Sequence, residues 1–284
     1  MNKLLHADLV RLRKSKFFLT CIVAAFGFAL FLVLLRYFEM KRYPNQGSGT
    51  DGLLTIGIVY APIIIAAFLG IFIGTEYSDG TMRNKLIVGH SRFCIYFANL
   101  ITAVISSFII FALYTITIIS FGLMLIGKFS LPADQLIKIL FLSFVSIIAF
   151  SSIFVLTGMI ITSKAAGAIT AIISAFILLM AAVSIQNRLN EPEYYEPYGY
   201  TVTDENGNTH EEYVEKEKNV RYLTGTKRKI YEFLNDFLPY SQLVQVGIQE
   251  SVPDDAVKFP LYSLFIIAAT TVCGSLAFRR KDLK

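Results

Sequence analysis

Residues 53–93 read LLTIGIVYAPIIIAAFLGIFIG followed by TEYSDGTMRNKLIVGHSRF, so an uncharged apolar run leads directly into a short charged stretch. A helix needs about 20 apolar residues to cross the hydrocarbon core of a bilayer. The first part is long enough to do so, whereas charged side chains are costly in lipid and exclude the second part from it. The sequence therefore predicts a membrane-spanning helix that ends near Gly74 and a polar segment that follows it outside the membrane.

Apolar runs of the same kind recur along the whole chain. Hydrophobic residues make up 55% of the 284 residues and charged residues only 17%, which is a composition typical of membrane proteins. We therefore expect an all-α polytopic membrane protein with six transmembrane helices. The six runs, none with a charged residue in its middle, cover residues 17–35, 53–74, 93–127, 136–162, 165–185 and 259–278.

Lysine and arginine are distributed unevenly between the two sides of such a protein. The segments on the side of both termini hold 13 basic and 4 acidic residues, and those on the other side hold 13 basic and 17 acidic residues. Short loops rich in lysine and arginine stay in the cytoplasm. We therefore expect a multi-pass cell-membrane protein with both termini in the cytoplasm. The net charge of +5 then reflects topology and predicts no nucleic-acid partner.

Charge and hydropathy divide the chain into four parts. Residues 1–16 predict a cytoplasmic amphipathic helix with basic side chains, a type that lies at the membrane interface. Residues 17–185 contain transmembrane spans one to five. Residues 186–258 are polar and predict a small extracytoplasmic α+β insertion between spans five and six. Residues 259–284 contain the sixth span and a cytoplasmic tail.

The charged stretch between the second and third runs fits about two turns of helix. Ser78 or Asp79 can cap its start, Met82 and Leu86 share an apolar face, and Gly89 can end it in the left-handed conformation. So short a helix is marginal alone in water. We therefore expect it to rest on a partner surface, either lipid headgroups or another protein.

The spacing of residues in this stretch resembles a known pattern. Glu76, Gly80, Thr81, Met82 and Arg83 match E-x-x-x-G-T-[LM]-[RK]-x-x-L, whose last position is Leu86, and a Ser-Arg pair follows at 91–92. The pattern is similar to the one between spans two and three of type-2 ABC exporter permeases, the membrane subunits of bacterial ATP-driven exporters. Six spans, the basic amino-terminal helix and the large loop before span six also resemble that family. Many of its members carry proline at the position of Gly89.

The resemblance implies that residues 76–92 form a coupling helix that docks on an ABC ATPase subunit. Met82 and Leu86 would be apolar anchors, Arg83 and Lys85 polar contacts, and Glu76 would pair with or cap the amino-terminal helix. The implied ATPase-coupling residues are Glu76, Asp79, Gly80, Thr81, Met82, Arg83, Lys85 and Leu86.

The chain contains no ATP-binding motif. A P-loop requires G-x-x-x-x-G-K-[ST] to hold phosphates, and no segment supplies it. We therefore expect that this chain is not an enzyme, that it holds no cofactor, and that ATP and magnesium bind to the partner ATPase. The three histidines are scattered and the three cysteines lie in or beside apolar runs, so the sequence predicts neither a catalytic site nor a metal site.

The polar insertion contains signals for a hairpin and for a helix. Asn206 and Gly207 lie between alternating residues, a strong hairpin signal. The following stretch, KRKIYEFLNDFLP, has apolar residues at helical spacing and ends at Pro239. We interpret this helix as an external gate or lid over the exit, or equally as a cap that packs on the outer ends of the spans. The residues concerned are Ile230, Phe233, Leu234, Phe237, Leu238 and Pro239.

These features together predict the permease subunit of an ATP-driven ABC exporter that moves an amphiphilic substrate outward by alternating access. The expected substrates are first antimicrobial or other hydrophobic peptides, including those exported in bacteriocin immunity. Drugs, as in multidrug efflux, and lipids come second. The expected partners are two copies of the ABC ATPase, a second permease that is identical or related, and the lipid bilayer. The alternative is a membrane sensor or immunity protein that does not transport and whose outer domain binds a ligand.

Overall fold

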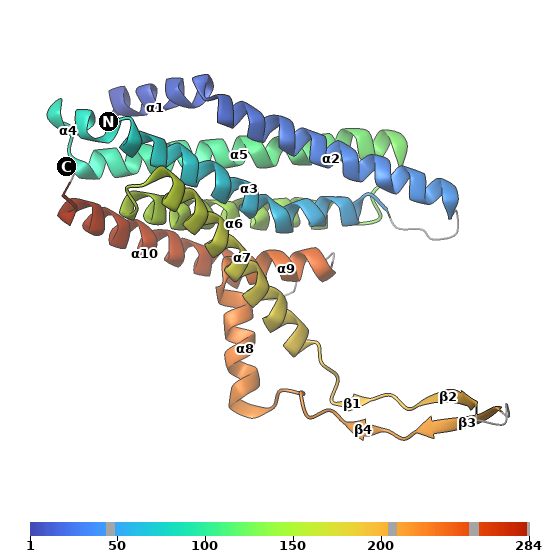
Figure 1. Cartoon of the computed structure of the whole chain (residues 1–284). Coiled ribbons are helices and arrows are strands. Elements are labelled where there is room, and N and C mark those ends of the chain that lie inside the picture. The colour runs from blue at the N-terminus through green and yellow to red at the C-terminus, as the bar shows by residue number, and fades with distance from the viewer. Residues whose placement is uncertain (44–48, 204–208, 250–255, 283–284) are drawn as a thin grey trace.

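The computed structural model of the chain describes residues 1–43, 49–203, 209–249 and 256–282. It is a bundle of long helices from which a narrow two-stranded ribbon projects (Figure 1). Among the described residues, six helices are long and apolar enough to cross a membrane, and they coincide with the six predicted runs. The all-α polytopic fold is thereby confirmed. These helices are α2 (Lys16–Arg42), α3 (Asp51–Ser78), α5 (Arg92–Leu125), α6 (Ala133–Ile160), α7 (Lys164–Leu189) and α10 (Lys258–Arg280).

The shorter helices and the strands form two groups. Helices α1 (Asn2–Lys14) and α4 (Thr81–Ile87) lie at the end of the bundle that carries both chain termini, which we call the terminus end (Figure 1). The other short elements all follow α7. They are β1 (Tyr194–Tyr195), β2 (Tyr198–Thr203), β3 (Thr209–Val214), β4 (Glu217–Lys218), α8 (Gly225–Phe237) and α9 (Pro239–Gln249).

Helix α3 lies at the centre of the bundle and packs against α5, α6 and α7. Small residues allow the closest of these approaches, as they commonly do between membrane helices. A Cβ atom added at Gly70 would lie 2.7 Å from the Cα atom of Ala168, and one added at Gly74 would lie 2.7 Å from that of Lys164. The backbones of α3 and α7 are therefore in direct contact.

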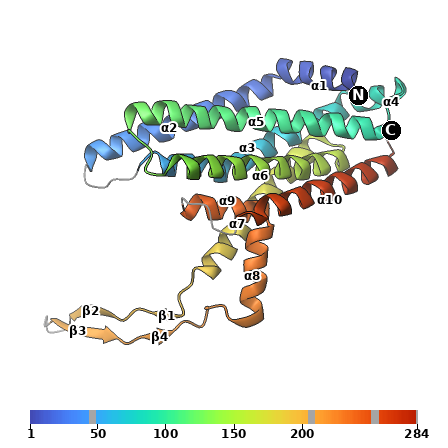
Figure 2. The same cartoon turned by 180° about the vertical axis from the view of Figure 1, so that it is seen from behind.

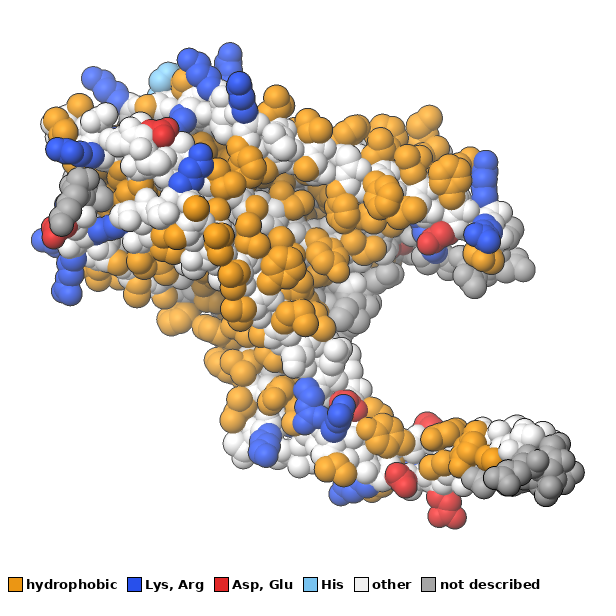
Figure 3. Space-filling model, viewed as in Figure 1, with side chains coloured by type: hydrophobic (Ala, Val, Ile, Leu, Met, Phe, Trp, Pro, Cys, Tyr) orange, Lys and Arg blue, Asp and Glu red, His pale blue; other side chains and the backbone are white. Residues whose placement is uncertain are grey.

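Helices α5, α6 and α10 form the opposite side of the bundle, where they lie side by side (Figure 2). Apolar side chains cover the flank of the bundle seen in Figure 3, and lysine and arginine gather at its terminus end. Only 17% of the most apolar part of α10 and 28% of that of α2 are buried, against 61% for α3. The outer helices thus present apolar surface suited to lipid or to another chain.

The ribbon consists of two short antiparallel sheets along the same pair of chain segments. Strand β2 pairs with β3 in a register that runs from Tyr198 opposite Val214 to Thr203 opposite Thr209, and β1 pairs with β4. The predicted hairpin is therefore present. Its predicted turn at Asn206 and Gly207 lies outside the described residues.

Candidate functional site: buried ion pairs at the terminus end

The turn between α3 and α4 gives a structural reason for the spacing of glutamate, glycine and threonine in the pattern E-x-x-x-G-T. Helix α3 ends at Ser78, and the chain reverses at Gly80, whose φ of +68° lies in the left-handed region that favours glycine. The Thr81 hydroxyl donates a hydrogen bond to the backbone carbonyl of Glu76 at 3.0 Å, which satisfies one of the free carbonyls at the end of α3. The turn therefore fixes where α4 begins relative to Glu76.

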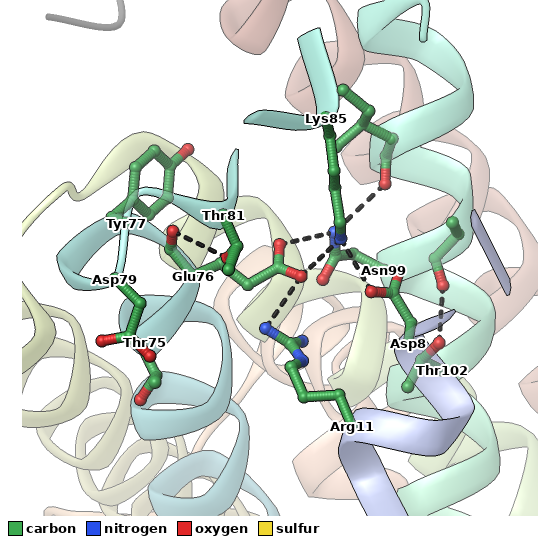
Figure 4. A network of polar contacts seen from close by, with 12 residues as sticks. Asp8, Arg11, Thr75, Glu76, Tyr77, Asp79, Thr81, Lys85, Asn99 and Thr102 are labelled. Carbon is green, nitrogen blue, oxygen red and sulfur yellow. Dashed lines mark hydrogen bonds and ion pairs between the residues drawn. The ribbon is translucent and has the colours of Figure 1, made fainter. Parts of the chain in front are cut away.

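The side chain of Glu76 is the centre of the site. It is fully buried, and a buried carboxylate is stable only when cations or hydrogen-bond donors surround it. Arg11 of α1 lies 2.8 Å from its Oε1 atom, and Lys85 of α4 forms an ion pair with the same atom. The Asn99 amide of α5 donates a hydrogen bond to Oε2 at 3.1 Å. Glu76 thus connects four helices, and its pairing with the amino-terminal helix is the one expected from the sequence (Figure 4).

A second carboxylate completes the network. Asp8 of α1 is almost fully buried and its Oδ1 atom accepts a hydrogen bond from Lys85 Nζ at 2.7 Å. Burial raises the pKa of Asp8 above its ordinary value of 3.8, and the negative charge of Glu76 raises it further, while Lys85 opposes both effects. Lys85 therefore joins two carboxylates that would otherwise repel each other.

The network is balanced in charge but incompletely hydrogen-bonded. With all groups ionised, Asp8 and Glu76 carry two negative charges, and Arg11 and Lys85 carry two positive ones. The guanidinium of Arg11 also stacks 3.8 Å from the ring centroid of Phe72, a favourable cation–π arrangement. One oxygen of Asp8 and the Nε and Nη2 atoms of Arg11 are buried without a hydrogen-bond partner. The ion pairs of Glu76 thus hold the site, and removing the charge of Glu76, Arg11 or Lys85 leaves a buried imbalance.

Helix α4 turns two of its predicted docking residues inward, which corrects the expectation from the sequence. Met82 is fully buried within the chain, and Lys85 is taken up by the network, so neither is available as an outer contact. Leu86 is half-buried against the core. The exposed residues of α4 and its end are Arg83, Asn84, Ile87, Val88 and Gly89.

The ends of α4 were predicted with mixed success. Neither Ser78 nor Asp79 caps its start, because Gly80 occupies the N-cap position without a side-chain hydrogen bond. Asp79 is exposed and instead ends α3. Gly89 does adopt the left-handed conformation, with φ +93°, and its backbone N–H donates to the Leu86 carbonyl at 2.9 Å. The predicted glycine exit from α4 is confirmed.

A sequence model of the family described as ABC-2 family transporter protein matches residues 4–182. This chain belongs to the ABC-2 transporter family. The match includes α1, α3, α4 and α5, so the whole ion-pair network lies within the family-defining part of the chain. No curated protein matches the chain.

The sequence signals for Asp8, Arg11 and Asn99 in this ABC-2 protein were too indirect for the sequence analysis to assign them to the site. Asp8 lies one turn from both Leu4 and Leu12, and all three are buried on one face of α1. An acid within an apolar stripe is therefore the signal that marks a buried partner. Asn99 lies near the start of an apolar span, two helical turns after Arg92, at a depth that matches the end of α3. The sequence shows the acid in the apolar stripe of α1 and the asparagine near the start of α5. Only the tertiary structure shows that the two side chains lie in the same network.

The second predicted site, the outer helix, is present as an amphipathic element. In α8, Phe233 and Phe237 stack at 5.5 Å between ring centroids, and both pack against Tyr262 of α10 at 6.0 and 5.6 Å. Ile230 and Phe233 remain half-exposed. Leu238 ends α8, and Pro239 begins α9 directly. The predicted apolar stripe therefore anchors α8 on the first turns of α10 and leaves part of itself uncovered.

Helix α9 lies within the bundle. Residues 241–246 of α9 are all buried, and the helix packs against α3, α6 and α7. The Gln242 Oε1 atom accepts hydrogen bonds from the hydroxyls of Ser146 and Ser263 at 3.2 and 3.1 Å. Its amide donates to the Asp236 carbonyl at 2.8 Å. Gln242 thus fixes α9 to α6, α8 and α10.

The described residues contain no group of three or more histidine, cysteine, aspartate or glutamate side chains that could hold a metal ion. The arrangement at the terminus end is suited to mechanical work. It joins the short helix α4 to α1 and α3 by ion pairs and, through Glu76, to α5 by a hydrogen bond, and a shift of α4 would break or move these contacts.

Proposed function

We propose that this chain is the permease subunit of an ATP-driven exporter and that α4 receives the movement of a separate ABC ATPase. The ion-pair network then carries the displacement of α4 to α1, α3 and α5. Family membership supports a transporter subunit, and the ion pairs that join α4 to α1 and α3, with α5 bound to the same Glu76, support the route. The observation that carries the proposal is the double ion pair of Lys85 with Glu76 and Asp8.

The docking surface in this proposal consists of the outward residues of α4. Ile87 and Val88 are 72% and 76% exposed, and Arg83 beside them supplies a positive charge. Large apolar side chains so exposed at the tip of a short helix are suited to a groove on a partner protein. Met82 has a different role here, because its buried side chain holds α4 to the bundle.

The charges and the surfaces of the bundle support the proposed orientation in the membrane and the proposed cargo. We place the terminus end in the cytoplasm, because lysine and arginine gather there (Figure 3). Alternating access would occur at the face between this chain and a second permease, to which the exposed apolar residues of the flank are suited. An amphiphilic cargo fits apolar spans without charged residues in their middle. Among such cargoes we place antimicrobial or other hydrophobic peptides first.

The experiment tests whether exposed residues of α4 hold the ATPase while the buried ones do not. The tagged chain is purified from its native membrane, the ATPase recovered with it is measured, and ATP hydrolysis is assayed in vesicles. We expect Val88→Asp and Arg83→Glu to abolish ATPase recovery while the permease itself remains folded and monodisperse. Lys14→Glu on α1, also an exposed residue at the terminus end, is the matched control and should retain the ATPase.

The same experiment identifies the ways in which the proposal can fail. Unchanged ATPase recovery with Val88→Asp would show that α4 is not the docking element. Absence of any ATPase in the wild-type preparation, with a ligand bound to the outer part of the chain, would favour the alternative of a sensor or immunity protein that does not transport. The projecting ribbon favours this second function, because it is an outer part of the chain to which a ligand could bind.

A further inference from the structure

The ribbon formed by residues 191–203 and 209–218 stands apart from the helical bundle (Figure 1). Its strands pair only with one another in the described part of the chain, as two two-stranded sheets. An isolated two-stranded hairpin is marginally stable in water. A strand pair that leaves the bundle without cover gains stability when a partner covers one of its faces.

One face of the ribbon carries two neighbouring tyrosines and two valines. Because side chains alternate between the faces of a strand and paired residues share a face, Tyr198, Tyr200, Val202 and Val214 lie on the same side. Tyr198 and Tyr200 are 60% and 44% exposed, with ring centroids 6.2 Å apart. Tyr213 belongs to the opposite face, where it pairs with Gly199. The ribbon thus offers a pair of neighbouring tyrosines on one face, while the opposite face of the β2–β3 pair carries the single Tyr213.

The ribbon is also strongly acidic. Its described segments, 191–203 and 209–218, contain seven glutamates and two lysines, a net charge of −5. Carboxylates and tyrosine rings both attract cations, and the ring attracts them through its face. The ribbon shows this chemistry internally, since Lys216 Nζ lies 4.8 Å from the ring centroid of Tyr194. An ammonium group from a partner would meet the same chemistry on the Tyr198 and Tyr200 face.

We propose that the ribbon is a docking surface for a cationic amphipathic peptide, whose apolar side chains cover the Tyr198 and Tyr200 face and whose lysines meet the glutamates. The net charge of the ribbon favours a cationic peptide over a second copy of the ribbon or an anionic membrane surface. A second copy of the ribbon would bring another five negative charges and be repelled, and so would an anionic membrane surface. This inference deepens the proposed function and rests on it, because it assigns to the exporter a surface that recognises its peptide substrate outside the bundle.

The first test measures peptide binding by the full chain in nanodiscs of zwitterionic phosphatidylcholine, without ATPase and without nucleotide. The probe is a fluorescent amphipathic peptide of lysine and leucine, about 18 residues long, and its counterpart has glutamate in place of lysine. We expect the lysine peptide to bind at least about tenfold more tightly than the glutamate peptide, with an affinity that falls as salt rises. Equal affinity for the two peptides would overturn the inference.

Matched variants locate the binding face. The double variant Tyr198→Ser/Tyr200→Ser should weaken binding of the lysine peptide by about tenfold, since aromatic anchors dominate such contacts. Tyr213→Ser removes a tyrosine of equal size from the opposite face and should change affinity less than about twofold. A separate variant with Glu193→Gln, Glu196→Gln, Glu215→Gln and Glu217→Gln keeps every tyrosine and should remove most of the salt dependence. Wild-type binding by both of the multiple variants would also overturn the inference.

Two further outcomes separate this inference from its rivals. Loss of permease dimers in the Tyr198→Ser/Tyr200→Ser variant would show that the face joins two copies of the chain, and the inference would be wrong. Because binding is measured without the ATPase, tight and selective binding by a chain that recovers no ATPase would sustain the ribbon inference and contradict the exporter proposal. ATPase recovery without peptide binding would do the reverse.

Discussion

Glu76 lies in the last turn of α3, where the helix dipole disfavours a negative charge and where its side chain is fully buried. Its stability therefore depends on Arg11 and Lys85. Glu76→Gln leaves one uncompensated positive charge in the network, and Lys85→Met leaves one uncompensated negative charge. Each change should cost about 3 kcal/mol of unfolding free energy, because breaking a buried pair strands its partner.

The double variant Glu76→Gln/Lys85→Met restores neutrality and should be clearly more stable than the sum of the two single effects predicts. Apparent Tm in detergent measures all three variants. Asp79→Asn, three residues along the chain and exposed, is the control and should shift stability by less than about 0.5 kcal/mol. Strict additivity of the two single variants would show that Lys85 and Glu76 do not interact.

Asp8 makes the stability of the site dependent on pH. Its pKa in the folded chain is above the ordinary 3.8, so in the interval between these two values the folded chain binds more protons than the unfolded chain. Stability from this group is therefore full below pH 3.8 and falls as pH rises toward the folded pKa. Asp8→Asn removes the titration, and its Tm relative to wild type should rise with pH across that interval. A Tm profile for Asp8→Asn that runs parallel to the wild-type profile would contradict the assignment.

Only part of this site could be predicted from the sequence, because Asp8, Arg11 and Asn99 lie on other helices than Glu76 and Lys85. The left-handed exit at Gly89 was predicted, because that conformation restricts residue type locally, whereas the left-handed turn at Gly80 was not. The inward direction of Met82 and Lys85 was not, because α4 is too short for its face to be assigned without knowing which side meets the bundle. An apolar residue on a short helix fits an outer partner and an inner core equally well.

At the scale of elements, the turn at Gly80 determines how α4 is joined to α3. An added Cβ at Gly80 would meet nothing within 4 Å, so Gly80→Ala tests backbone conformation without a clash. The left-handed conformation should cost alanine about 1–2 kcal/mol. We expect a lower Tm and weaker coupling of ATP hydrolysis to transport, because α4 shifts relative to Glu76.

Gly27 of α2 is the matched control for this glycine. An added Cβ there also meets nothing within 4 Å, but Gly27 lies inside a regular helix, so alanine should be neutral or stabilising by up to about 1 kcal/mol. Equal effects of Gly80→Ala and Gly27→Ala on Tm would show that the turn conformation contributes nothing specific.

The same scale shows why the long helices were predictable and α9 was not. Each of the six spans is long and apolar enough to be recognised from composition, and α3 and α7 pack where Gly70 and Gly74 lie. Helix α9 is short and contains polar residues such as Gln242, so its sequence alone does not mark it as buried. Its burial depends on hydrogen bonds from Ser146 and Ser263, which lie in two different helices and become neighbours only in the folded bundle.

At the scale of the whole molecule, the proposed function requires the terminus end and the ribbon to lie on opposite sides of the membrane. The two sides differ in charge, since the segments on the terminus side carry 13 basic and 4 acidic residues. A variant without Cys21, Cys94 and Cys273 provides a background in which single cysteines report their side. We expect Tyr213→Cys on the ribbon to react with a membrane-impermeant maleimide in intact cells.

Arg13→Cys on α1 and Val88→Cys at the end of α4 should react only after the membrane is permeabilised, because the proposed orientation, which rests on the basic loops, places this end in the cytoplasm. All three positions are exposed, so differences in labelling report the side of the membrane and not burial. Labelling of Arg13→Cys in intact cells would reverse the orientation and place α4 out of reach of any cytoplasmic ATPase. Labelling of Tyr213→Cys alone places the acidic ribbon where a peptide outside the cell can reach it.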